Sequence, residues 1–186
     1  MSTAPAPGGL ASRLTAGPCL SGSPPELPDE IAALAGTHGD AFTALLQGIA
    51  AYSPFLWRLA LADPGRLERF AASAPEEAQA EIVAAQRAIG RRFAAGELTR
   101  DAAASELRRN RAASALLIAL ADLGGAWSVE EVTAALSDFA DASVESATEI
   151  ALVEAASSGK VAPPAEDGTG TGLVVLALGK HGAREL

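Results

Sequence analysis

Helix-starting residues and helix breakers divide residues 29–157 into a series of segments, and this pattern constrains the fold more than any other feature of the chain. Ser53 and Asp63 each stand directly before a proline. This arrangement favours the start of a helix, because the side chain caps free N–H groups and proline suits the first helical position. We therefore predict two short helices here, after a helix that begins near Asp40 and ends near Tyr52.

The longer segments have equally clear ends. One begins at Pro75 with carboxylates in its first turn and ends at Gly96, and the next runs from 100 to 123. Residues 128–131 then have the capping-box pattern. After them, apolar residues recur at three- and four-residue steps, which predicts one apolar stripe along a helix of many turns. The stripe contains Val129, Val132, Leu136, Phe139, Ala140, Val144, Ala147 and Ile150.

Composition separates this helical region, residues 29–157, from its flanks. Residues 1–28 are rich in Pro, Gly and Ser and offer little apolar surface, so we expect a mobile leader. Residues 158–171 have the composition of a linker, and residues 172–186 form a short C-terminal segment. Aromatic residues make up only 4% of the chain. Small and aliphatic side chains must therefore build the core, which suits closely packed helices and predicts a mainly α fold.

The C-terminal segment carries an apolar run followed by glycine and lysine. Residues 173–178 have no charge and include two adjacent valines, which predicts a buried β-strand. Gly179 and Lys180 follow, at the start of an expected helix whose free N–H groups suit a phosphate. The spacing matches neither a Walker A loop nor a dinucleotide fingerprint. An ordinary strand-to-helix turn is the alternative, and the motif by itself favours that alternative.

A second candidate site is a basic cluster in the predicted helix 100–123. It consists of Arg108, Arg109 and Arg111, and the first and last of these are one helical turn apart. The cluster is consistent with a contact to an anion or an acidic partner. A solvated helix face is the alternative, and the spacing alone favours it.

Charge and residue usage argue against several classes of function. A net charge of −9 argues against non-specific binding to nucleic acid. The single cysteine, Cys19, and the two histidines, His38 and His181, are too few for a closed zinc site of the usual Cys and His ligands. No apolar stretch is long enough to span a membrane and no secretory signal is visible, so we expect a cytoplasmic protein.

Four blocks of residues follow one another in a specific order. They are 53–59 with 63–64, 107–111 with 118–125, 128–141, and 179–186. Together they resemble the N-terminal part of the bifunctional glutamine synthetase adenylyltransferase/adenylyl-removing enzyme. The resemblance covers residues 42–186.

The resemblance implies a fold, a chemistry and partners. The fold is a helical N-terminal region followed by the first strand of a polymerase β-type nucleotidyltransferase core, which is truncated here. The complete enzyme adenylylates and deadenylylates a tyrosine of glutamine synthetase, using Mg²⁺ and ATP or ADP, under the control of the PII signal protein. By this resemblance, our chain belongs to the adenylyl-removing, phosphorolytic half. Glutamine synthetase and PII are the expected partners.

The resemblance also assigns the candidate site. In this family a metal-binding Asp-x-Asp pair follows the Gly-Lys turn, and no such pair occurs in residues 1–186. Only Gly179 and Lys180 match the phosphate-binding turn, so no catalytic residue and no metal ligand is assigned. We expect the fragment alone to be inactive and to bind neither nucleotide nor Mg²⁺ tightly.

Two other interpretations remain open at this point. The chain is alternatively an acidic helical interaction module without catalytic activity. A dinucleotide-binding protein cut short after its first strand is the third interpretation. The missing middle glycine of the fingerprint and the long helical region that precedes the strand argue against it.

Overall fold

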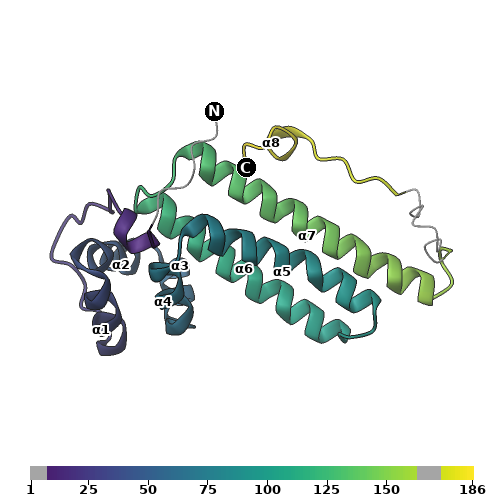
Figure 1. Ribbon diagram of the computed structural model, residues 1–186, viewed down its shortest axis with the longest axis horizontal. Coiled ribbons are helices and arrows are strands. Elements are labelled where there is room, and N and C mark those ends of the chain that lie inside the picture. The colour runs from purple at the N-terminus through teal and green to yellow at the C-terminus, as the bar shows by residue number, and fades with distance from the viewer. Residues whose placement is uncertain (1–7, 163–172) are drawn as a thin grey trace.

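The computed structural model describes residues 8–162 and 173–186, and it is mainly helical. Three long helices lie side by side, with the first and third running in one direction and the second in the other (Figure 1). These are α5 (Pro75–Ala94), α6 (Arg100–Leu123) and α7 (Val129–Ser157). Four shorter helices gather at one end of this bundle: α1 (Asp29–His38), α2 (Asp40–Tyr52), α3 (Pro54–Leu61) and α4 (Pro64–Ala72). The described residues contain no β-strand.

Capping side chains begin the helices where the sequence predicts them. The side chains of Ser53 and Asp63 accept backbone N–H groups in the first turns of α3 and α4, at 3.3 and 2.9 Å. Ser128 and Glu131 form both hydrogen bonds of the capping box at the start of α7. The predicted helix 100–123 is confirmed as α6.

Part of the N-terminal leader is packed against the helices, which differs from our expectation that residues 1–28 are mobile. Leu10 begins the 3-10 helix η1 (Leu10–Arg13) and is fully buried in the core. The N–H of Leu10 donates to the carbonyl of Ser73 at 2.9 Å. The carbonyl of Gly124, the C-cap residue of α6, accepts the N–H groups of Thr15 and Ala16. The buried leucine and these hydrogen bonds together offset the ordering entropy that the composition alone suggested would dominate.

A hydrogen-bonded ion pair joins the leader to the bundle. Arg13 Nη1 lies 2.6 Å from Glu76 Oε2, and Trp127 Nε1 donates to Glu76 Oε1 at 2.6 Å. Burial raises the pKa of Glu76, but the hydrogen bonds from Arg13 and Trp127 outweigh it, and the pKa of Glu76 lies below its ordinary value. The cluster therefore ties η1, the start of α5 and the residues before α7 together as long as Glu76 is ionised.

Small side chains form most of the packing face of α7, and only part of the predicted apolar stripe contributes to it. Ala135, Ala142 and Ser146 are buried there. Several large members of the predicted stripe are instead exposed, including Val129, Leu136 and Val144. The pattern identified the helix correctly, but only part of the predicted stripe, including Val132, packs against the core.

The close approach of α5 explains why α7 packs through small residues. A Cβ atom placed on Gly90 of α5 would lie 3.1 Å from the Cα atom of Ser146. Ser146 Oγ also donates to the carbonyl of Gln86 at 2.5 Å, and Gln86 Nε2 donates to Ser143 Oγ at 3.1 Å. A large side chain at this seam would separate the two helices. The helix ends at Ser157, and most of the expected linker, residues 163–171, lies outside the described residues.

Candidate functional site

The C-terminal segment runs back along α7 (Figure 1). Residues 173–178 are not a strand, and their large side chains are exposed, with Val174 at 73% and Leu178 at 83%. The prediction of a buried strand is therefore not met in this structure. The physical reason is that a strand forms by pairing with a neighbouring strand, and the described residues contain no other strand.

The glycine-lysine turn forms the short helix α8 (Gly179–Gly182). Gly179 has φ of 62°, a left-handed conformation that glycine adopts without strain. A Cβ atom on Gly182 would lie 2.5 Å from the carbonyl oxygen of Ala177, so glycine is also required where the turn folds back on the chain. Lys180 lies between the two glycines and is exposed.

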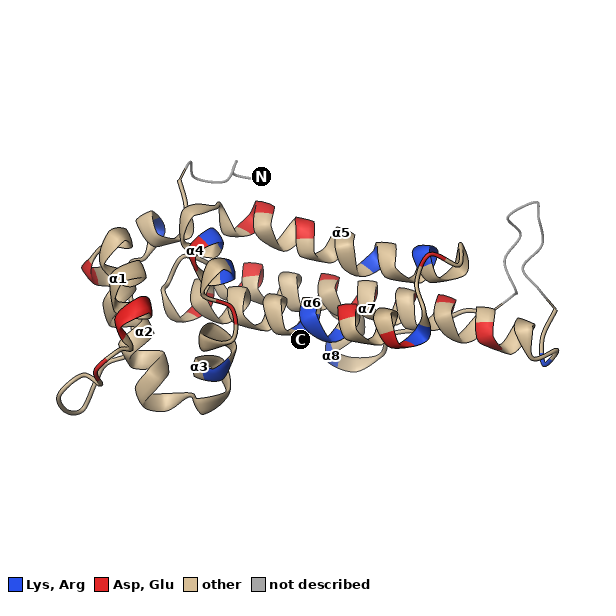
Figure 2. Ribbon diagram, turned by 90° about the horizontal axis from the view of Figure 1, so that it is seen from below, with Lys and Arg blue, Asp and Glu red and all other residues tan. Residues whose placement is uncertain are grey.

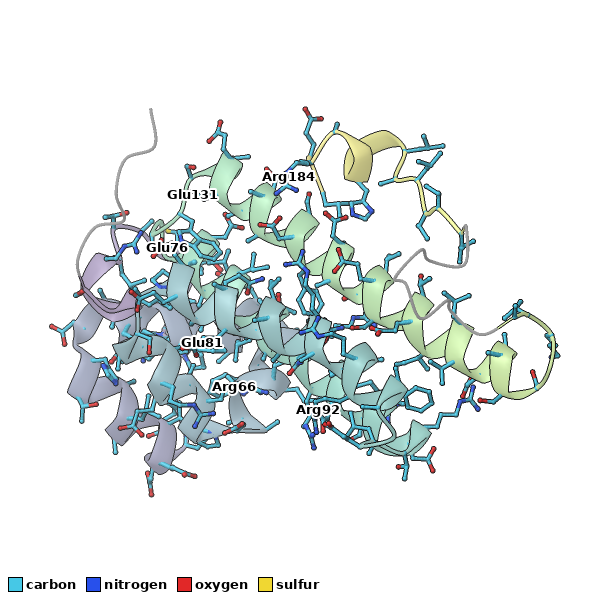
Figure 3. The ribbon with its side chains drawn as sticks, turned by 45° about the vertical axis from the view of Figure 1, so that its right-hand side comes forward. Arg66, Glu76, Glu81, Arg92, Glu131 and Arg184 are labelled. Atoms are coloured by element: carbon cyan, nitrogen blue, oxygen red, sulfur yellow. The ribbon has the colours of Figure 1, made fainter. Side chains whose placement is uncertain are left out.

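Two side-chain contacts hold this turn against α7. His181 Nε2 lies 2.7 Å from Asp141 Oδ1. Arg184, which is labelled in Figure 3, donates from Nη2 to Asp138 Oδ1 at 2.6 Å. The hydrogen bond to Asp138 and its negative charge raise the pKa of Arg184. The two aspartates are three residues apart on one face of α7, and that spacing is the signal in the sequence that could have identified them as a docking pair.

The arginine cluster lies at a separate place, between α3, α4 and α6. Arg108 and Arg109 line a groove of about 350 Å³ together with Arg66 of α4, while Arg111 is not among the lining residues. The structure thus separates Arg111 from the other two arginines of the predicted cluster. It adds Arg66, which no spacing in the sequence connects to them. It does not bring the arginines to Gly179 and Lys180.

Neither candidate site contains a ready cluster of metal ligands. In residues 8–162 and 173–186, His, Cys, Asp and Glu side chains nowhere form a group of three that could hold a metal ion. Within the same ranges, none of the helices combines the length and the apolar character needed to cross a membrane.

Comparison with known families decides the family of the chain. The sequence model of glutamate-ammonia ligase adenylyltransferase matches residues 43–186. The chain belongs to this family. The matched region begins in α2, includes both candidate sites and extends through the Gly179–Lys180 turn.

Relatives of the family share about two residues in five with this chain. Two of them are named bifunctional glutamine synthetase adenylyltransferase/adenylyl-removing enzyme. The protein from Rhodopseudomonas palustris is 41% identical over 87% of this chain, and the protein from Xanthobacter autotrophicus is 42% identical over 86% of it. A relative from a Bradyrhizobium species is 40% identical over 95% of this chain. These matches cover 16%, 16% and 19% of the relatives, so the chain spans less than a fifth of their length. No solved structure matches the chain.

Proposed function

We propose that this chain is part of an enzyme that attaches AMP to a tyrosine of glutamine synthetase and removes it, and that it serves the adenylyl-removing, phosphorolytic half. The observation that carries the proposal is the similarity to relatives of that name over most of this chain. The matched segment is a small part of those relatives. We therefore assign a supporting role to residues 1–186, in which a helical scaffold carries the first phosphate contact.

The proposed phosphate contact is the turn at Gly179 and Lys180. A left-handed glycine lets the backbone turn sharply there, and the exposed lysine provides a cation that a phosphate can reach. Mg²⁺ and ATP or ADP are the proposed cofactors of the complete enzyme, in which the metal would neutralise charge on the reacting phosphate. Residues 1–186 contain no Asp-x-Asp pair to hold that metal.

The exposed apolar run before the turn supports the same proposal. Val174 and Leu178 are mostly exposed, although a run of this composition favours burial. As the first strand of a nucleotidyltransferase core, residues 173–178 would have these exposed apolar side chains covered. Glutamine synthetase is the proposed protein substrate and the PII signal protein the proposed regulator, both by resemblance to the family.

A chimeric enzyme tests the proposal. The matching segment of the Rhodopseudomonas palustris relative would be replaced by residues of this chain, and both reactions would be measured on glutamine synthetase beside the unmodified relative. We expect the chimera to release ADP from adenylylated glutamine synthetase in the presence of phosphate and Mg²⁺. A folded chimera that removes AMP normally but no longer adenylylates glutamine synthetase would contradict the assignment to the adenylyl-removing half.

A second assay addresses residues 1–186 alone. We expect this polypeptide to release no ADP from adenylylated glutamine synthetase with phosphate and Mg²⁺, because it contains no Asp-x-Asp pair. The unmodified relative is the positive control. ADP release by the isolated polypeptide would show that other residues of the chain carry the reaction.

A further inference from the structure

A single face of α6 forms one wall of the arginine groove. Ser105, Arg108, Arg109 and Ala112 are spaced at three and four residues, so they share one side of the helix. The opposite wall contains Leu59 and Ala62, from α3 and its C-terminal end, and Asp63 and Arg66, from the start of α4. Segments that are about forty residues apart in the sequence thus enclose one groove.

The groove has more positive than negative charge. Three arginines line it, and the one carboxylate among its lining residues, Asp63, already accepts the backbone N–H of Arg66 at 2.9 Å. Arg66 Nη2 donates to the carbonyl of Leu59 at 2.9 Å, while its Nε is buried without a hydrogen-bond partner in the described part of the chain. Buried donors normally find a partner, so the hydrogen bonding of Arg66 is incomplete in this structure.

The nearest acidic residue outside the groove is only weakly engaged with its arginines. Arg109 Nη2 lies 3.9 Å from Glu106 Oε1, whereas Arg92 Nη1 lies 2.7 Å from Glu106 Oε2. Glu106 is therefore paired mainly with Arg92. Within residues 8–162 and 173–186, Arg108 makes no ion pair. Figure 2 shows Lys and Arg on α3, α4 and α6, although the whole chain has a net charge of −9.

We propose that this groove binds a carboxylate-rich segment of a protein partner. Arginine forks bind carboxylates in pairs of parallel hydrogen bonds, and arginine is enriched in protein interfaces. The side chain of Arg109 is 68% exposed, so the groove is too open to enclose a small molecule, whereas an acidic segment lying across it would cover the arginines and the apolar wall. A nucleic acid is a poorer occupant, because its binding depends on many cations along the phosphate backbone and, among the described residues, only three arginines line this groove.

Binding of a labelled acidic peptide tests this proposal without any catalytic assay, so it can fail independently of the proposed function. Fluorescence anisotropy would measure the affinity of residues 1–186 for a fluorescein-labelled octaglutamate peptide. Arg108→Glu and Arg109→Glu each reverse a charge that lines the groove. Arg111→Glu makes the same change on the same helix, away from the groove, and is the matched control. Circular dichroism would confirm that all three variants keep their helices.

We expect Arg108→Glu and Arg109→Glu each to weaken peptide binding by about tenfold or more, and Arg111→Glu by about twofold or less. No binding of the peptide by the unmodified chain would overturn the proposal. An equal loss in Arg111→Glu would overturn it too, because the effect would then come from overall charge. Displacement of the peptide by inorganic phosphate at a lower concentration than by unlabelled octaglutamate would show a phosphate site and would also refute it.

Discussion

Replacing Leu10 by alanine tests whether the leader is part of the folded core. Leu10 is fully buried against the helices, although composition predicted that its segment is mobile. Removing the buried methyl and methylene groups of a leucine and leaving a cavity costs about 3 kcal/mol of unfolding free energy. For a protein of this size each kcal/mol lowers the melting temperature by about 2–4 °C, so we expect a decrease of about 6–12 °C.

Thermal unfolding of residues 1–186, followed by circular dichroism, measures this decrease. The matched control is Leu178→Ala, which makes the same chemical change at a side chain that is 83% exposed. We expect the control to melt within about 1 °C of the unmodified chain, because surface substitutions rarely change stability by much. Equal melting temperatures for Leu10→Ala and Leu178→Ala would refute the packing of the leader.

Three further predictions concern the bundle. Glu76→Gln lowers the unfolding free energy by about 1–2 kcal/mol at neutral pH, since it weakens the charged hydrogen bonds from Arg13 and Trp127. Because the pKa of Glu76 is lowered in the folded state, its ionisation stabilises the fold above pH 4.5, the ordinary pKa, and that stabilisation is lost as the pH falls through the lower, folded pKa. The melting temperatures of the unmodified chain and Glu76→Gln should therefore converge in acid. A difference that stays constant with pH would contradict this. Gly90→Leu lowers the unfolding free energy by about 1–3 kcal/mol, because the added side chain separates α5 from α7. Gly36→Leu, at a position in open space on α1, is neutral or stabilising in the same melting assay. Similar effects of the two changes would argue against the close packing of α5 on α7. Ser128→Ala removes the cap of α7 and costs about 1 kcal/mol in urea unfolding, and an unchanged midpoint would show that the capping box contributes nothing.

The helical architecture could be predicted because its signals are local. Ser53, Asp63 and Ser128 cap helices through atoms within three residues of themselves, so their sequence context determines where each helix starts. The packing of α7 could not be predicted in the same way. Its buried face depends on the approach of Gly90 from α5, and the spacing of Leu136 and Val144 contains no information about that neighbour.

The candidate sites show the same division between local and distant information. The Gly179 turn was predicted because glycine before lysine, after an apolar run, is a local pattern. Residues 173–178 are not a strand, because a strand forms against a neighbouring strand and the described residues contain no other one. Arg66 was missed because only the folded arrangement of α3, α4 and α6 brings it to the groove that Arg108 and Arg109 line.

The rates of both reactions in the chimeric enzyme, with Lys180 replaced by alanine, would test the central claim most directly. Lys160→Ala, which removes the chain's other lysine, is the control. If Lys180 contacts a nucleotide phosphate of the adenylyl-removing half, Lys180→Ala should lower ADP release from adenylylated glutamine synthetase by on the order of 100-fold. Adenylylation should stay within about twofold of the control. An unchanged rate of ADP release, or an equal loss of both reactions, would contradict the account.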